Sequence, residues 1–465
     1  MRSRENNVEN ITYVLICFAC FFLIIDLACE KTFYLFEIFF ILVFLTVLYK
    51  LKINFSADFL NNKEFGFFST EKVLIALAVY LFVDCINSFY SQNYEYIFEK
   101  YKVVLSTLGI GMGIYLYCDE EKKLVLLKKT FFLASSFISL ITVLDYVFFG
   151  KIGLNYILRF SLRRDYNVYS TAIFVGFVFQ IFLILKSNSN MLRKIINLFA
   201  INIICLPTML LSGSRRIMVM LISTACLCLI VMFAQLLRYR KNIFEMISTI
   251  GLLSIATAII CLQISGLQNY MIYIYNTPKS IYAPNISKSA EITALERLET
   301  ASNVGAFQKR KIIWEMGINE FENYTLTQKI FGKGNCYDIV YYNTAHNKSL
   351  ETAYGGRENY VGKMSAHSFV LADLLNGGFL KLAVSIWLIY EIGKMVVIKF
   401  FENPINILAY IIIFSLCIGG DLISNRYGLL YDKILILAIF MLVKEGAKNN
   451  EKRWKGVYNH LSSPS

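Results

Sequence analysis

The side chains best suited to proton transfer in this chain are its three histidines, His346, His367 and His460. Histidine is the natural general base near neutral pH, because its unperturbed pKa is about 6.5. His367 stands where the polar stretch 266–366 gives way to an apolar segment, whereas His460 lies in the basic tail. We take His367 as the candidate catalytic base and keep His346 as a candidate substrate contact. A structural histidine is the alternative in each case.

Two adjacent arginines, Arg215 and Arg216, lie in the segment Leu211–Ile217, which joins two apolar runs with almost no polar connector. An arginine at the centre of a membrane helix costs about 2.5–3.5 kcal/mol on insertion scales, and less near the surface. Both guanidinium groups must therefore lie near a membrane surface or inside a helix bundle. They either extend to lipid phosphates or form a planar, permanently charged clamp for a diphosphate.

A further basic group, Lys309–Lys311, is followed closely by Trp314. On a helix Arg310 and Trp314 share one face, because residues four apart are neighbours. That face offers one cation and one ring on which a sugar can stack. The alternative is an ordinary amphipathic surface helix.

Composition restricts the class of protein that must position these residues. The 465 residues are 57% hydrophobic and only 17% charged, whereas soluble domains are about 45–50% apolar and about 25% charged. Long apolar runs recur along the chain, so we expect an all-α polytopic membrane protein. Soluble enzymes, nucleic-acid-binding proteins and disulfide-stapled secreted proteins are excluded. The net charge of +13 falls in short clusters between apolar segments, as in membrane proteins with cytoplasmic positive charge.

The sequence offers no recognisable metal or nucleotide site. Cys17 and Cys20 have the spacing of a metal-binding pair, but no second pair accompanies them. A phosphate loop, a His-Glu-x-x-His pair and an Asp-x-Asp pair are all absent from the sequence. We therefore expect chemistry without a metal or a cofactor, driven by the substrate's own bond energy.

A spanning helix needs about 20 mostly apolar residues, because its backbone must satisfy its hydrogen bonds internally. Twelve segments meet this description approximately. They are 11–29, 32–49, 72–89, 103–118, 124–149, 168–185, 195–211, 217–237, 245–265, 367–393, 404–420 and 428–443.

Lysines and arginines indicate the orientation of these spans. A cytoplasmic N-terminus places most of them on the cytoplasmic side, so both termini are expected there. Arg159, Arg163 and Arg164 run against this bias, which makes them either ligands for an anion or solvated charges. The predicted organisation is 1–265 with nine spans, 266–366 as a partly helical extracytoplasmic loop, 367–443 with three spans, and 444–465 as a basic cytoplasmic tail.

Four short motifs between residues 155 and 395 resemble, in order, those of the O-antigen ligase/polymerase family of bacterial surface-polysaccharide enzymes. Asp165–Tyr169 resembles the family's Asp-Pro-Asn entry into a span, with Tyr166 in place of proline. Leu211–Arg215 resembles its Ser-Arg motif between two spans. Arg310–Trp314 followed by Ile330–Gly334 resembles its Arg…Trp…Phe-Gly-x-Gly run.

The fourth motif contains the candidate base. Ala366–Ser368, with Leu371 and Gly377, resembles the family's Ala-His-Asn-x-x-Leu motif and its later glycine, with Ser368 in place of asparagine. His346 also begins a His-Asn pair, but no apolar span follows it, so we favour His367.

The resemblance implies a membrane-embedded glycosyltransferase similar to the type C class, which uses a polyprenyl-diphosphate sugar donor without a metal ion. An acceptor hydroxyl would attack the sugar C1, with His367 positioning or deprotonating that hydroxyl. Arg215 and Arg310 would neutralise the departing diphosphate. Arg216, Trp314, His346 and one of Arg159, Arg163 or Arg164 would help to hold the substrate.

The resemblance leaves the acceptor open. A polymerase joins lipid-linked repeat units of an O-antigen, capsule or exopolysaccharide on the outer face of the cytoplasmic membrane, and we favour this reading. A ligase moves the finished glycan to lipid A-core or protein. A flippase for the same lipids is a third reading, although the long outer loop and the few intramembrane acids argue against it. A flippase and a chain-length regulator are candidate protein partners, besides the membrane lipid itself; nucleic acid is not expected as a partner.

Overall fold

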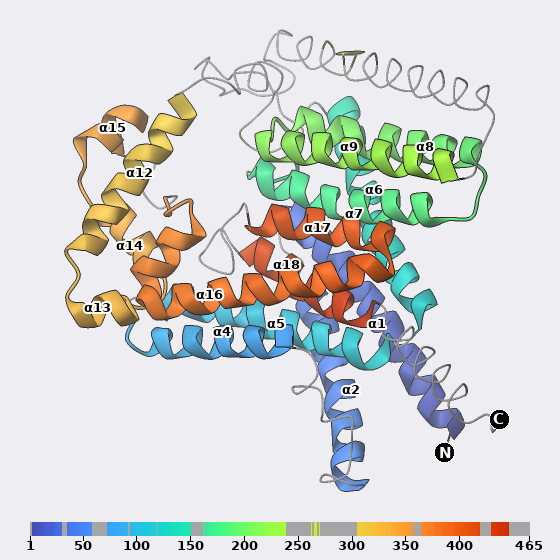
Figure 1. The fold of residues 1–465 in the computed structure, drawn as a ribbon, viewed down its shortest axis with the longest axis horizontal. Coiled ribbons are helices and arrows are strands. Elements are labelled where there is room, and N and C mark those ends of the chain that lie inside the picture. The colour runs from blue at the N-terminus through green and yellow to red at the C-terminus, as the bar shows by residue number, and fades with distance from the viewer. Residues whose placement is uncertain are drawn as a thin grey trace, which may run out of the picture.

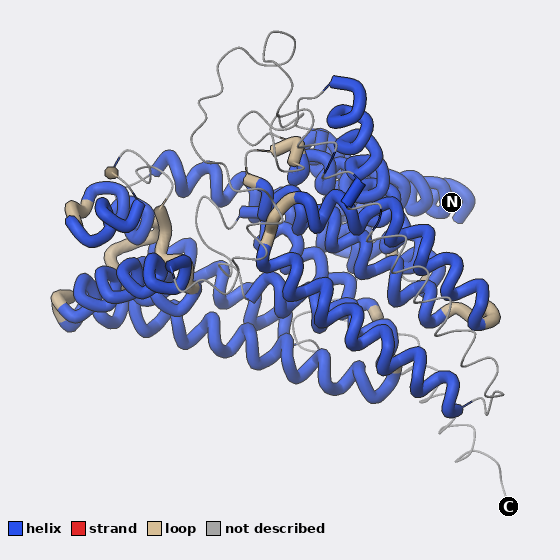
Figure 2. The backbone as a smooth tube through the Cα atoms, turned by 90° about the horizontal axis from the view of Figure 1, so that it is seen from above, coloured by secondary structure: helices blue, strands red, loops and turns tan. Residues whose placement is uncertain are grey.

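The computed structural model describes residues 2–29, 35–57, 72–91, 94–118, 120–149, 161–163, 165–238, 262, 265–266, 269, 305–354, 356–357, 364–418 and 429–445. Across these ranges every regular element is a helix and no strand occurs (Figure 2). This agrees with the all-α fold expected from composition.

Most helices of the described chain form one bundle (Figure 1). They are α1 (Arg2–Ala28), α2 (Leu35–Ala57), α4 (Lys72–Phe89), α5 (Tyr94–Tyr117), α6 (Glu121–Phe149), α7 (Tyr166–Lys186), α8 (Met191–Leu211), α9 (Arg215–Arg238), α16 (Phe369–Glu402), α17 (Pro404–Ile418) and α18 (Leu429–Lys444). Seven helices of the described residues are long and apolar enough to cross a membrane. The protein is therefore an all-helical membrane protein.

Four further helices gather at one end of the bundle, on the left of Figure 1. They are α12 (Gly305–Glu322), α13 (Leu326–Phe331), α14 (Tyr337–Thr344) and α15 (Lys348–Tyr354), and together they are called the cap. Helix α12 is a helical part of the predicted loop 266–366, and it carries Arg310 and Trp314. Of the predicted span 245–265 the structure describes only residues 262 and 265.

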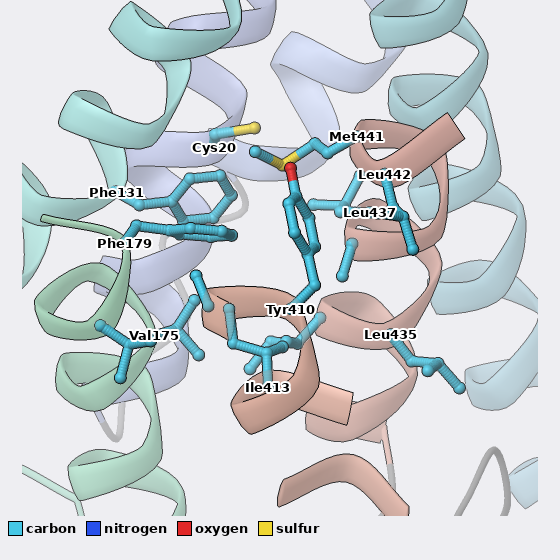
Figure 3. Packing of buried hydrophobic residues seen from close by; sticks show 14 of the residues in the cluster. Cys20, Phe131, Val175, Phe179, Tyr410, Ile413, Leu435, Leu437, Met441 and Leu442 are labelled. Atoms are coloured by element: carbon cyan, nitrogen blue, oxygen red, sulfur yellow. The ribbon is translucent and has the colours of Figure 1, made fainter. Parts of the chain in front are cut away.

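The bundle is organised around α7, which is apolar and buried on almost every side. A helix that is hydrophobic all round belongs in the interior of a protein or a membrane. In Figure 3, Phe179 of α7 lies between Phe131 of α6 and Tyr410 of α17, each ring centroid being 5.7 Å from that of Phe179. This packing fixes the outer helices to one central element.

Two helices differ from the segments expected from hydropathy. Helix α5 begins at Tyr94 rather than at 103, and it includes Lys100, which lies outside the predicted span 103–118. Helix α16 is broken at Gly378, whose φ is 63°, so that Phe369–Gly377 is a separate short segment. That segment packs with Ile313 and Tyr342 of the cap. The cap therefore extends past the boundary predicted at residue 366.

The cap is joined to the bundle by closely packed glycine-containing backbone. The amides of Lys333 and Gly334 donate to the carbonyls of Leu375 and Asn376, at 3.1 and 2.9 Å. Gly332 has a φ of 73°, and a Cβ atom there would collide with the backbone of Asn376. These contacts, between residues 332–334 and 375–378, are called the glycine joint. It allows two backbones to approach more closely than side chains permit.

We expect Gly332→Ala to destabilise the protein by at least about 2 kcal/mol, because it adds both a backbone strain and a steric clash. Gly393→Ala is the matched control, since a Cβ atom there meets nothing within 4 Å. Thermal unfolding of the two purified variants checks the difference. Equal melting temperatures would contradict the role assigned to the glycine joint.

Candidate functional site

The first two motifs meet where α7 and α9 begin. Asp165 caps α7, with its carboxylate accepting from the amides of Asn167 and Val168. The Asn167 side-chain oxygen accepts from the hydroxyl of Ser214, at 2.9 Å. Short polar side chains are well suited to such caps, because they satisfy backbone donors that the helix leaves unpaired. The link holds the start of α9, and thus its arginines, against the start of α7.

The structure brings together His367, Arg216 and Arg310. His367 lies in the connection before α16, Arg216 in the first turn of α9 and Arg310 on α12 of the cap. The charges of Arg310 and Arg216 both act on the His367 ring. Three segments far apart in sequence thus bring two guanidinium groups within electrostatic range of one imidazole.

Arg215 occupies the neighbouring position, as the first residue of α9, and like Arg216 it is half-buried. Sequence reasoning had ranked Arg215 above Arg216 on the Ser-Arg resemblance. The electrostatic contact with His367 instead favours Arg216 as the partner of Arg310.

His367 has an unusual backbone conformation. Its φ is 50°, in the left-handed region that few residues other than glycine adopt and that costs of order 1–3 kcal/mol. The surrounding bonds hold this geometry, since Asp338 accepts from the Ala366 amide at 3.5 Å and from Asn376 Nδ2 at 2.9 Å. Asn376 Oδ1 in turn accepts from the Asp338 amide at 2.9 Å. Strained backbone of this kind is concentrated at functional sites.

The His367 ring is accessible to solvent at its surface, yet protein atoms surround it closely. This enclosure, together with the charges of Arg310 and Arg216, lowers the pKa of His367 to about 4. Both causes disfavour the protonated ring, since one removes water and the other adds like charge. The free protein therefore holds a neutral imidazole, able to accept a proton, across the physiological range.

This lowered pKa predicts the acid limit of any activity that needs neutral His367. Activity at limiting substrate is expected to stay level from about pH 8 to about pH 5 and to fall only near pH 4, because that profile follows the free enzyme. The lowered pKa also affects stability. The unfolded chain binds this proton below about pH 6.5, so His367 lowers the free energy of unfolding as the pH drops towards 4. A kcat/KM profile checks this, and an acid limb near pH 6.5 would contradict it.

A buried group of charges that sequence reasoning did not assemble lies beside the glycine joint. Asp84 Oδ1 is 2.8 Å from Lys100 Nζ and 2.7 Å from Lys381 Nζ, while Asp373 lies 3.9 Å from Lys381. These four residues, called the ion-pair cluster, are each at most 2% exposed. They carry two charges of each sign, so the cluster is neutral as a whole.

The ion-pair cluster also holds the cap. Lys381 Nζ donates to Asn335 Oδ1 at 2.8 Å, and Asn335 Nδ2 donates to the Asp84 carbonyl at 2.6 Å. Ser385 donates to Asp373 at 2.6 Å and so links the two parts of α16 across the Gly378 break. The sequence did contain a signal for the ion-pair cluster, because charged residues of both signs occur inside apolar segments.

Other predicted residues have neighbours of their own. Trp314 packs against the apolar core of the cap, so its ring face is used at least partly for folding. Arg163 donates to the carbonyls of Asp26 and Leu27, at 3.4 and 3.2 Å, and thus caps the end of α1. Arg159 and Arg164 lie outside the described residues.

His346 lies in a different setting from His367. Its ring contacts Arg357 and lies 3.5 Å from Glu351, and its side chain is three-quarters exposed. Asn347, the second residue of the competing His-Asn pair, accepts from the Leu350 amide and so caps α15. This pair therefore has a local structural role at the start of a cap helix.

Comparisons with known proteins add no assignment to this geometry. No protein-family model matches the chain, and no curated protein matches it. Among the described residues, no group of three or more His, Cys, Asp or Glu side chains is arranged to hold a metal ion.

Proposed function

We propose that this protein is a membrane glycosyltransferase that polymerises polyprenyl-diphosphate-linked repeat units of a surface polysaccharide. The observation that carries the proposal is that the charges of Arg216 and Arg310 both act on the His367 imidazole. A neutral imidazole and two permanent planar cations are the groups needed to activate a hydroxyl and to neutralise a departing diphosphate.

In the proposed reaction, an acceptor hydroxyl oxygen forms a bond to the sugar C1 while the bond from C1 to the diphosphate oxygen breaks. His367 takes the hydroxyl proton, and the polyprenyl diphosphate leaves with its charge balanced by Arg216 and Arg310, with Arg215 close by. A diphosphate bound between the arginines offsets their effect on His367. The pKa of His367 then rises towards the working pH, which suits a general base.

The proposed topology has twelve spans, both termini in the cytoplasm and the cap on the outer face of the cytoplasmic membrane. Eleven of the twelve segments expected from hydropathy coincide with described helices of the bundle. Repeat units must reach the outer face before polymerisation, so a flippase is expected to act upstream.

Gel analysis of surface and lipid-linked glycans in a strain that lacks the protein tests this proposal. A polymerase is indicated by single repeat units on the final acceptor with no long chains. Long chains that stay on the polyprenyl carrier would identify a ligase instead. An unchanged glycan profile, or failure of lipid-linked units to reach the outer face, would overturn the glycosyltransferase proposal.

A further inference from the structure

The cap has an apolar surface that continues onto the bundle. Helix α13 has no buried side chain, and Leu326, Ile330 and Phe331 on it are 78%, 40% and 44% exposed. Six residues that expose two large aliphatic side chains and one aromatic ring are expensive to leave in water. Some apolar medium must cover them in the working protein.

Two contacts make this surface continuous with the outside of the membrane helices. Tyr90, directly after α4, donates to the carbonyl of Phe331 at 2.5 Å. On α12, the ring of Phe321 meets Phe379 of α16 edge to face, at 5.4 Å between centroids. Phe379 is itself 54% exposed on a helix long and apolar enough to cross a membrane. The surface on α13 therefore adjoins a surface that faces lipid.

The polar groups of α13 suit the boundary between lipid and water. Thr325 and Gln328 form a reciprocal capping box, so the helix satisfies its first backbone donors without water. Exposed Tyr90 and Tyr94 lie at the adjoining ends of α4 and α5, and tyrosine is enriched where a membrane meets water. Figure 1 shows α13 at the ends of α4 and α16, on the opposite side of the cap from α15.

We propose that α13 lies in the interfacial layer of the lipid bilayer, with Leu326, Ile330 and Phe331 inserted among the acyl chains, and so anchors the cap to the membrane. The partner is the lipid surface itself. The depth of an interfacial helix is set by its buried apolar face. The anchor does not depend on the proposed glycosyltransferase activity.

Tryptophan fluorescence of the full-length protein in lipid nanodiscs tests the proposal. Leu326→Trp places a ring in the inferred lipid layer, and Thr352→Trp, on the exposed side of α15, is the matched control. The fluorescence added to that of the three native tryptophans is measured with lipids brominated near the headgroup end of their chains, and separately with iodide in the water. Both positions are exposed, so neither ring has to enter the core.

The proposal predicts that brominated lipid reduces the Leu326→Trp signal roughly twofold or more relative to the control, while iodide quenches mainly the Thr352→Trp signal. Quenching of Leu326→Trp by iodide and not by brominated lipid would place α13 in water and overturn the proposal. Shielding of Leu326→Trp from both quenchers would mean that a protein surface covers α13, which would overturn it equally.

Discussion

Replacing His367 by alanine is expected to abolish chain elongation while lipid-linked single repeat units accumulate. General-base catalysis contributes about 10²–10⁴-fold to rate, and a loss of that size reduces long glycan chains below detection. Glycan gels from a strain that carries the variant, together with transfer assays on lipid-linked repeat units in liposomes, measure the effect. Immunoblots of the membrane fraction establish that the variant is present at the normal level.

Two companion variants separate chemistry from backbone geometry. Asparagine tolerates the left-handed conformation of position 367, so His367→Asn keeps the fold without the base and is expected to be as inactive as alanine. His346→Ala tests the competing histidine. Long chains made by His367→Ala, or their loss in His346→Ala alone, would contradict the assignment of His367.

Replacing Arg216 or Arg310 by lysine keeps the charge but is still expected to abolish chain elongation. Lysine carries one point charge and lacks the planar fork that binds diphosphate with two parallel hydrogen bonds.

Lys381→Met is expected to be the most destabilising single change in the bundle. Removing one partner of a buried ion pair costs about 3–5 kcal/mol, because it leaves an uncompensated charge in a medium of low polarity. Asp84 and Asp373 would then share only Lys100. Thermal unfolding measures the loss of stability. The rate of proteolysis of the cap measures it there, since Lys381 also bonds Asn335, which directly follows the glycine joint.

The design of this experiment depends on the balance of charge. The double variant Asp84→Asn with Lys381→Met removes one charge of each sign, so it is expected to be more stable than Lys381→Met alone. Lys394→Met, at an exposed position of the same helix, is the control and is expected to be neutral. If Lys381→Met behaves like the Lys394 variant, the ion-pair cluster does not stabilise the cap.

Hydropathy predicted the seven described helices that are long and apolar enough to cross a membrane, because a spanning helix has to be apolar along its whole length. The same reasoning failed where charges are paired in three dimensions. Lys100 was left outside the predicted span because its neutralising partner, Asp84, lies on another helix. The break in α16 had a signal, the adjacent glycines Gly377 and Gly378, but hydropathy predicted 367–393 as one span.

The sequence indicated which residue types form the candidate site, but not how their side chains are arranged. The sequence pattern indicated His367 and Arg310, and the structure places them in electrostatic contact. Sequence reasoning preferred Arg215 to Arg216, whereas the effect of Arg216 on His367 favours Arg216; which arginine faces the ring depends on the angle at which α9 begins. Arg310 and Trp314 do share one helix, but the sequence could not reveal that the Trp314 ring packs into the core of the cap.

The ion-pair cluster implies an order of assembly during synthesis. Asp84 and Lys100 lie on consecutive helices, so they enter the membrane as a hairpin that already neutralises itself. Asn335 emerges from the ribosome later and Lys381 later still, so Asn335 completes its bond to Lys381 only once α16 has been inserted. The cap is thus among the last parts of the described chain to acquire its final form. A nascent chain stopped before α16 therefore lacks the lysine that bonds Asn335 of the cap.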